Sequence, residues 1–266
     1  MVDFEFKNKY NCGDLEKIME LLRQPGGCPW DAKQTHESIK QNLIEETYEV
    51  IEAINKKDDA LLCEELGDIM MQVVFHAQME KEKGTFDFDD VCDGICKKLI
   101  IRHPHVFGDT RADSVEKVLS NWDEIKNRTK GRKTVTDSME SVPRELPALM
   151  RATKLQKKAA DVGFDWPDSS GAFDKLYEEF AELREAVDQG DKSHIEEEFG
   201  DLLFAAVNVS RFIKTDAEEA LTKASDKFLF RFSKVEAIAK ERGIDMKSAP
   251  LETLDAIWDE VKSGSI

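Results

Sequence analysis

The sequence has no long apolar run. Its longest apolar stretch, 69–75, is interrupted by Gln72 and falls far short of the roughly 20 residues that a membrane span requires. The opening residues, MVDFEFKNKY, mix charged with apolar side chains and contain no apolar signal-peptide core. We therefore expect a cytoplasmic protein without a membrane partner.

Cysteine is scarce, and its spacing argues against both a disulfide framework and a zinc site. The cysteines number five and are Cys12, Cys28, Cys63, Cys92 and Cys96. Cys92 and Cys96 lie four residues apart on an expected helix, but no second pair matches them, and a zinc site needs about four ligands. We expect all of them to be buried, reduced thiols.

The motifs of several enzyme classes are also missing. The chain has neither a Gly-x-x-x-x-Gly-Lys-Ser/Thr phosphate loop nor a Gly-x-Gly-x-x-Gly after a strand, and no Ser–His–Asp or Cys–His arrangement stands out. No histidine follows a glutamate by three residues, which argues against the Glu-x-x-His spacing of a di-iron bundle.

Basic residues are outnumbered by acidic ones, 38 to 55, which gives a net charge of −17. This charge repels the phosphates of DNA and RNA, so we expect no nucleic-acid partner. The same charge would repel any small polyphosphate. Such a ligand would therefore have to come with a divalent cation and meet a local basic pocket.

Helical periodicity, by contrast, is abundant. With only seven prolines and few alternating β-branched residues, almost every segment is predicted to be helical. The predicted helices cover 14–24, 36–55, 59–82, 88–102 and 114–127, followed by 145–160, 171–188, 192–213, 215–241 and 251–262. The stretch between the two sets is polar, begins with basic residues and contains two prolines, which is typical of a linker.

The two sets of helices resemble each other. EETYEVIEAI (45–54) matches EEFAELREAV (178–187), and EELGDIM (64–70) matches EEFGDLL (197–203), both at an offset of 133 residues. KKLIIR resembles DKFLFR, and WDEIK resembles WDEVK, in the same order along the chain. These repeats indicate an internal duplication. We predict an all-α protein of two tandem, related helical-bundle domains, 1–128 and 148–266, joined by a linker over 129–147.

Each copy carries carboxylates at spacings of three, which place them on one helical face. In the first copy, Glu65 and Asp68 lie on a helix that is otherwise apolar and is expected to be buried. A buried carboxylate needs a partner, because leaving it unpaired costs several kcal/mol. Together with the preceding helix, these side chains predict a hard-cation site for Mg²⁺ or Mn²⁺. For Glu45, Glu52 and Glu64 taken singly, a solvated acidic face is the better interpretation.

Basic and aromatic side chains also recur at matched positions. Lys98 with Arg102, and Lys227 with Arg231, are pairs spaced by four residues, as are Trp122 with Lys126 and Trp258 with Lys262. Lysine and arginine contact phosphates, and tryptophan stacks on a base or a sugar. The alternative is an exposed helical face in which a tryptophan anchors the last helix of each domain. Because these pairs recur in both copies, we favour a role in nucleotide binding over the structural alternative.

The pattern EExxE followed by ExxD, present twice, resembles the MazG family of nucleoside triphosphate pyrophosphohydrolases. The resemblance covers nearly the whole chain and includes the strings GGCPWD, EETYEV, EELGDIMMQVVFHAQ, RHPHVF, PRELPALMRATKLQKKAADVGFDW and EEFGDLLFAAVN. It implies an all-α homodimer that binds Mg²⁺ and cleaves NTPs and dNTPs of broad specificity between the α and β phosphates, giving a nucleoside monophosphate and pyrophosphate.

The resemblance also assigns roles to residues. The implied metal ligands are Glu179, Glu182, Glu198 and Asp201 in the second domain and Glu46, Glu49, Glu65 and Asp68 in the first. The implied nucleotide contacts are Lys227, Arg231, Trp258 and Lys262, and the internal repeat adds Lys98, Arg102, Trp122 and Lys126. Glu178, or Glu45 in the first domain, adjoins the ligands and is our hypothesis for the general base.

The sequence departs from the family pattern at two places in the second domain. His194 stands where a basic residue often precedes the second ExxD, and Phe230 replaces an arginine in the KFERR string. Both departures predict weaker phosphate binding there. Two alternatives stay open: a narrower dUTP or dCTP pyrophosphatase, and, because a duplicated copy is free to lose activity, a domain that only binds nucleotide or a protein partner or serves as a dimer scaffold.

Overall fold

The computed structural model describes residues 4–109, 114–129, 131 and 134–264, and within these residues it contains helices and no strand. The predicted all-α fold is therefore confirmed. The chain divides into two compact units, Met1–Lys126 and Asn127–Ile266, which are described separately here. The domain bounds that the sequence predicts remain a prediction, and residues 130 and 132–133 of the expected linker lie outside the described part.

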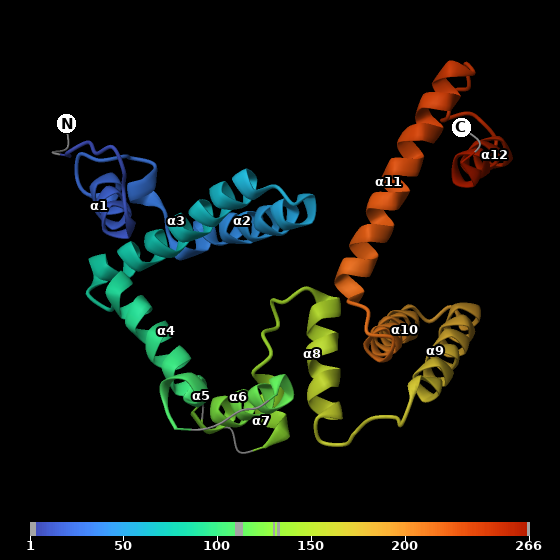
Figure 1. The fold of residues 1–266 in the computed structure, drawn as a ribbon. Coiled ribbons are helices and arrows are strands. Elements are labelled where there is room, and N and C mark those ends of the chain that lie inside the picture. The colour runs from blue at the N-terminus through green and yellow to red at the C-terminus, as the bar shows by residue number, and fades with distance from the viewer. Residues whose placement is uncertain (1–3, 110–113, 130, 132–133, 265–266) are drawn as a thin grey trace. The chain divides into compact units, whose positions relative to one another are not determined.

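The first unit is built on an antiparallel helical hairpin. Its elements are α1 (Cys12–Arg23), the 3₁₀ turn η1 (Asp31–Lys33), α2 (His36–Lys56), α3 (Asp59–Lys83), α4 (Phe88–Arg102), α5 (Pro104–Phe107) and the start of α6 (Val115–Thr129). Figure 1 shows α2 and α3 side by side, with α1 against α3. Their buried core consists of Met19, Ile39, Val74, Phe75 and Met79.

Local chemistry explains where the hairpin begins and turns. Thr35 accepts a hydrogen bond from the amide of Ser38 and starts α2, and the side chain of Ser38 returns the contact in a capping box. Lys57 then adopts a left-handed conformation with a φ of 55°, which ends α2. Asp58 follows at once and accepts from the first amides of α3. The connection is thus short, and α2 and α3 pack as direct neighbours.

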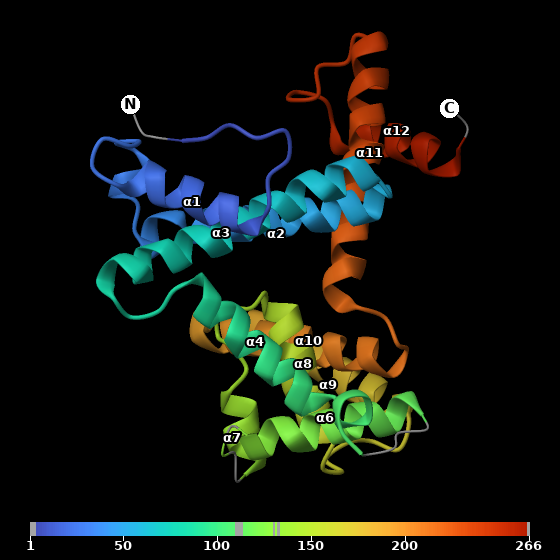
Figure 2. The same ribbon diagram turned by 60° about the vertical axis from the view of Figure 1, so that its left-hand side comes forward.

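The second unit repeats this hairpin and extends it. It contains α7 (Val135–Glu140), α8 (Ala148–Ala160), α9 (Ser169–Gln189), α10 (Lys192–Phe212), α11 (Ala217–Glu241) and α12 (Leu251–Ser263). Helices α9 and α10 form the hairpin, and α8 packs on α10. Helix α12 packs along the far half of α11, away from α9 and α10, in both Figure 1 and Figure 2.

A short helix that the sequence analysis missed lies within the stretch interpreted as a linker. Thr134 and Asp137 form a capping box that starts α7. The ammonium of Lys158 on α8 lies 2.5 Å from the hydroxyl of Ser138, which ties α7 to α8. The segment is polar, so its composition alone resembled a linker, although this part of it is folded.

Two expectations about burial are wrong. None of the five cysteines is fully buried: Cys12, Cys63 and Cys96 are exposed, although all five are free thiols as expected. Helices α3 and α10 are also not buried all round, because the neighbouring helices cover only part of each surface. The exposed apolar side chains of these two helices are Leu66, Met70, Phe199, Leu203 and Phe204.

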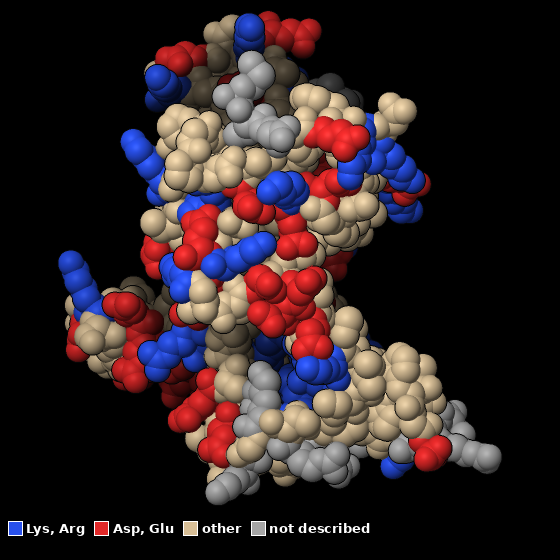
Figure 3. Space-filling model, turned by 90° about the vertical axis from the view of Figure 1, so that its left-hand side faces the viewer, with Lys and Arg blue, Asp and Glu red and all other residues tan. Residues whose placement is uncertain are grey.

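Across the part of the chain that the structure describes, none of the helices combines the length and apolarity needed to cross a lipid bilayer. On the face seen in Figure 3, acidic and basic side chains are interspersed and separated by uncharged surface.

Candidate functional site

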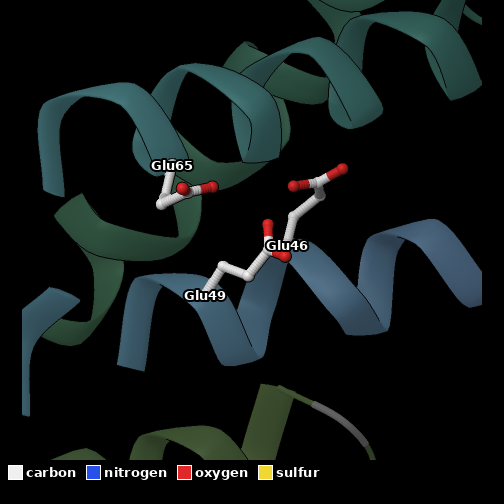
Figure 4. Close-up of side chains that lie close together, drawn as sticks. All are labelled: Glu46, Glu49 and Glu65. Carbon is white, nitrogen blue, oxygen red and sulfur yellow. The ribbon is translucent and has the colours of Figure 1, made fainter. Parts of the chain in front are cut away.

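A group of carboxylates lies between α2 and α3 in the first unit. Glu46 and Glu49 project from α2 and Glu65 projects from α3, so that one oxygen of each lies within 4.8 Å of the others. Figure 4 shows the three side chains pointing toward one another between the two helices. Glu65 is buried, with 8% of its surface exposed, whereas Glu49 is exposed. The group therefore lies at the edge of the helix interface, where solvent can reach it.

The surroundings raise the pKa values of two of these carboxyl groups, Glu46 and Glu65. Burial raises the pKa of Glu46, and the charges of Asp68 and Glu49 raise it further. Burial likewise raises the pKa of Glu65, with Glu49 adding to the effect. Burial and neighbouring charges thus disfavour the ionised form of each carboxyl group, and a divalent cation would stabilise that form. Asp68, the fourth predicted ligand, is not one of the three grouped residues but lies close enough to act on Glu46.

The second unit has the equivalent group between α9 and α10. Glu179, Glu182 and Glu198 each place one oxygen within 4.8 Å of the others. Glu179 is only 5% exposed, and the pKa of Glu182 is raised by burial first and then by the charge of Glu179. The structure therefore brings together three of the four predicted metal ligands in each unit, from two helices that the duplication makes equivalent. The predicted ligand roles themselves remain a prediction.

The second group carries cations of its own. The ammonium of Lys175 lies 2.6 Å from carboxylate oxygens of both Glu178 and Glu179, and this pairing raises the pKa of Lys175. The Nε2 atom of His194 lies 3.0 Å from Glu198. At the same offset of 133 residues, the first unit has Asn42 and Leu61, which carry no positive charge. The two groups share their ligand chemistry but differ in their charge balance.

Lys175 is a functional candidate that the sequence analysis did not identify. It precedes Glu179 by four residues on α9, a spacing that places the two side chains on one face of a helix. That spacing was readable from the sequence, but an i, i+4 pair of lysine and glutamate is also common on exposed helical faces. The two hypothetical general bases lie outside the carboxylate groups: Glu178 pairs with Lys175, and Glu45 is exposed on α2.

Two of the four predicted nucleotide contacts of the first unit, Arg102 and Trp122, lie in contact with each other. The guanidinium of Arg102, at the end of α4, lies 5.3 Å from the centre of the Trp122 indole on α6. The ring of His103 contacts the same indole edge-on at 4.8 Å. Lys98 lies one turn before Arg102 on α4, and Lys126 lies one turn after Trp122 on α6.

The corresponding residues of the second unit form a separate group. Lys227 and Arg231 belong to α11, and Trp258 and Lys262 belong to α12. The Trp258 ring lies 5.3 Å from that of Phe228. Among the described residues, no hydrogen bond or ion pair joins these side chains to the carboxylates of α9 and α10. Phe230, which replaces the family's arginine, is exposed, and the ammonium of Lys234 lies 5.2 Å from its ring.

A pocket of about 300 Å³ opens beside the second carboxylate group. One end is lined by Lys175, Glu179 and Asp201, so the pocket reaches both a grouped ligand and the predicted ligand outside the group. The rest of the lining comes from Met139 of α7, from α8, from the loop 164–166 and from apolar and polar side chains of α10. The loop holds the end of the GFDW string, to which the sequence analysis assigned no role.

Comparison with known proteins places these features in a family. The model of the MazG nucleotide pyrophosphohydrolase domain matches the chain twice, over residues 34–107 and 170–248, and each match contains one carboxylate group. The chain belongs to the MazG family. The double match agrees with the duplication that the sequence repeats and the two hairpins indicate.

Members of the MazG family align with the chain over nearly its whole length. A Thermotoga maritima protein named nucleoside triphosphate pyrophosphohydrolase/pyrophosphatase MazG is 49% identical over 94% of this chain and 95% of its own. The nucleoside triphosphate pyrophosphohydrolase of Escherichia coli K12 is 48% identical over 95% of this chain and 97% of its own. The Bacillus subtilis protein YabN is 49% identical over 93% of this chain, which spans 51% of that longer relative.

Proposed function

We propose that the protein is a Mg²⁺-dependent nucleoside triphosphate pyrophosphohydrolase, which converts NTPs and dNTPs of broad specificity to nucleoside monophosphate and pyrophosphate. Two full-length relatives at 48–49% identity carry the name of this activity. The observation that supports the proposal most is the pair of three-carboxylate groups, each built by two facing helices.

The residues present fit a hard cation. Carboxylate oxygens within 4.8 Å of one another match the oxygen ligands that Mg²⁺ prefers, and Mn²⁺ shares that preference. Burial first, and then the charges of neighbouring carboxylates, raise the pKa values of Glu46, Glu65 and Glu182, and a bound cation would offset both effects. When bound, Mg²⁺ would neutralise the charge that builds up on the phosphate oxygens during hydrolysis.

The chain's own side chains would bind and orient the triphosphate. Lys175 would exchange its contact with Glu179 for a phosphate oxygen, since an ammonium binds either anion. The basic residues of α4 and α11 are the further phosphate contacts that we propose. Glu178, or Glu45 in the first unit, would take the proton of the attacking water in this hypothesis. Full turnover by Glu178→Ala would remove that residue from the mechanism.

We also propose that the protein is a cytoplasmic homodimer without a nucleic-acid partner. The net charge of −17 disfavours nucleic acid. Large apolar side chains of α11 are exposed, and a second copy of the chain could cover them; they are Leu221, Phe228, Leu229, Phe230 and Phe232. Light scattering would then give twice the chain mass of 30.3 kDa.

Product analysis tests the proposed reaction. The purified protein would be incubated with Mg²⁺ and each common NTP and dNTP, and the products separated by ion-exchange chromatography. We expect a nucleoside monophosphate and pyrophosphate, and no product in EDTA. Diphosphate and phosphate would show that the wrong bond is cleaved, and a single strongly preferred substrate such as dUTP or dCTP would favour the narrower enzyme.

Separate alanine substitutions test whether each domain is active. Asp68→Ala and Asp201→Ala each remove one predicted ligand from one unit. If both units hydrolyse nucleotide, each variant retains part of the turnover and the double variant retains none. If neither variant loses activity, the carboxylate sites are not catalytic, and a nucleotide-binding scaffold becomes the better explanation.

A further inference from the structure

The pocket beside the second carboxylate group has one polar atom without a partner. Gln156, on α8, lines this pocket and is 7% exposed. Its amide nitrogen donates a hydrogen bond of 2.7 Å to the backbone carbonyl of Phe204, which fixes the orientation of the amide group. Its Oε1 atom is buried and accepts no hydrogen bond from any described residue. A buried acceptor without a partner costs about 1–3 kcal/mol, so this atom calls for a donor from a ligand.

A second polar group in the lining has the opposite character. The Oδ1 atom of Asn208, on α10, accepts hydrogen bonds from the guanidinium of Arg211 at 2.8 and 3.2 Å. Because its oxygen is engaged, the group that Asn208 has left to offer is the amide NH₂, a donor. The pocket therefore combines an acceptor from α8 with a donor from α10.

Aromatic side chains form part of the remaining lining, and an ion pair within the lining holds the loop 164–166 in place. Trp166 and Phe204 contribute aromatic surface to the lining. The guanidinium of Arg211 binds both carboxylate oxygens of Asp165, at 2.7 and 2.5 Å, and so fastens the loop 164–166 to α10. A Cβ atom built on Gly171 would lie 2.2 Å from the Trp166 ring, so the absence of a side chain there lets the indole lie against α9.

Size and position indicate what the pocket would hold. A volume of about 300 Å³ lies at the lower end for small-molecule sites, which suits a base with its sugar rather than a whole triphosphate. The end lined by Lys175, Glu179 and Asp201 is the end where the phosphates and the cation would lie. A flat, apolar group with hydrogen-bonding edges would occupy the other end.

We propose that this pocket is the nucleobase subsite of the second unit, and that it prefers adenine and cytosine over uracil and guanine. This inference rests on the proposed function. Adenine and cytosine place an amino donor beside an unprotonated ring nitrogen, which complements the acceptor of Gln156 and the donor of Asn208. Uracil and guanine present a carbonyl beside a ring N–H, which reverses the pattern and sets acceptor against acceptor.

The comparison of CTP with UTP is the sharpest test, since the two bases have nearly the same size. Binding of the α,β-methylene analogues of CTP and UTP, which resist hydrolysis, would be measured by calorimetry with Mg²⁺, alongside kcat/KM for both nucleotides. The assays use the full chain carrying Asp68→Ala, so that the second unit is observed. We expect the CTP analogue to bind roughly tenfold or more tightly than the UTP analogue.

Two variants assign that preference to the named atoms. Gln156→Leu keeps the size of the side chain but removes the acceptor, and should abolish the preference for cytosine. Asn208→Asp keeps the contact with Arg211 but replaces the donor by an acceptor, and should shift the preference toward uracil. Gln189→Leu, at the end of α9 and outside the pocket lining, is the matched control and should change neither.

The outcomes separate the two proposals. Equal binding of both analogues by the Asp68→Ala protein, or an unchanged preference when Gln156→Leu or Asn208→Asp is added to it, would overturn the base subsite while NTP turnover stands. Absence of turnover with every NTP and dNTP would instead overturn the proposed function, and the analogue binding would still report on the pocket. If Gln156→Leu does not fold, Asn208→Asp decides by itself.

Discussion

At the residue scale, the carboxylate group of the second unit has Lys175 and His194 as partners, and the first unit has neither. Lys175 partly neutralises Glu179 and Glu178, whereas Asn42 occupies the equivalent place in the first unit. Glu179 is nearly inaccessible to water, so its charge depends on that partner. In the second unit, a cation therefore lies beside the buried carboxylate of Glu179 before any metal arrives.

Removing this ammonium should destabilise the metal-free protein. We expect Lys175→Met to lower the free energy of unfolding by about 1 kcal/mol in EDTA, less than for a fully buried pair, because the lysine itself is half-exposed. Thermal unfolding followed by circular dichroism would measure it, and added Mg²⁺ should restore much of the loss. Lys223→Met, which breaks an exposed pair with Glu219 on α11, is the control and should change stability by less than about 0.5 kcal/mol. Equal effects of both substitutions would contradict the assigned role of Lys175.

Gly171 is the residue whose size most directly controls the pocket wall. A methyl group there would meet the Trp166 ring at 2.2 Å and force the indole to move. We expect Gly171→Ala to destabilise the protein by about 1–3 kcal/mol and to shift the tryptophan fluorescence.

Gly94→Ala is the matched control for this substitution. An added Cβ at Gly94, within α4, meets no atom within 4 Å, so this change should be neutral or stabilise the protein by up to about 1 kcal/mol. A tolerated Gly171→Ala with unchanged fluorescence would show that the indole does not lie where the structure places it.

At this scale, the sequence predicted well which side chains share one face of a helix. It predicted poorly which side chains from distant segments contact each other. Glu46 and Glu49 share a helical face by their spacing alone, and the structure groups them as the spacing requires. Nothing local to Gln156 reveals that its Oε1 atom lies buried beside Asn208, since that depends on how α8 packs on α10.

At the scale of the elements, a histidine pair joins the start of α2 to the later half of α3. The Nδ1 atoms of His36 and His76 lie 2.7 Å apart, and the two rings are nearly parallel, at 6°. The ring centres are 5.0 Å apart, which places both nitrogens between the rings, so that a single proton can bridge them. Nε2 of His36 lies 2.6 Å from Glu80, whose pKa is lowered to about 2 by hydrogen bonds from Lys83, Thr85 and His36.

This pair makes the stability of the hairpin depend on pH. Burial, and then the charge of His36, lowers the pKa of His76 below the 6.5 that it has when unfolded. The unfolded chain therefore binds a proton that the folded chain refuses, so stability is full above about pH 6.5 and falls as the pH drops below it. We expect the melting temperature to fall between pH 7.5 and 5.5, and the fall to be smaller in His76→Gln.

His105→Gln serves as the control for this measurement, because His105 takes no part in the pair and its removal should leave the pH dependence unchanged. Glu80 affects stability in a lower pH range. The stability that this carboxylate contributes above pH 4.5 is lost as the pH falls toward 2. An identical pH dependence in His76→Gln and in the unsubstituted protein would contradict the role given to the histidine pair.

The main helices could be predicted from the sequence because their apolar period and end signals agree. The predicted 36–55 and 59–82 correspond to α2 and α3, and capping residues and Gly84 mark the ends. Helix α7 could not be predicted in this way, since its polar segment carries no apolar period and its support comes from α8. The apolar pattern of α10 indicated burial, but the neighbouring helices leave Phe199 and Leu203 exposed.

At the scale of the whole molecule, the duplication predicts two metal sites for each chain. Calorimetric titration with Mg²⁺ should reveal two binding events of different affinity, because Lys175 competes with the ion only in the second unit. Glu65→Gln should remove one event and Glu198→Gln the other. A single event that both substitutions weaken would contradict the independence of the two sites.

The separation of the predicted nucleotide contacts from the carboxylates in the second unit belongs to this scale too. The sequence repeats showed which residues correspond, but they carry no information on distance. Trp258 packs against Phe228 at the α11–α12 pair rather than at α9 and α10. A repeat can therefore predict the composition of a site more reliably than its assembly.

The ammonium of Lys175 would also affect the order in which an ion and an anion bind to the second unit. In the second unit it pairs with the Glu179 carboxylate, and an ion bound there would displace it and free it to meet an anion. Ion loading and anion capture would thus occur in a fixed order in one half of the chain, while the other half, with Asn42 in that position, would follow no such sequence. One polypeptide would then hold two versions of the same chemistry that respond differently when the supply of ions runs low.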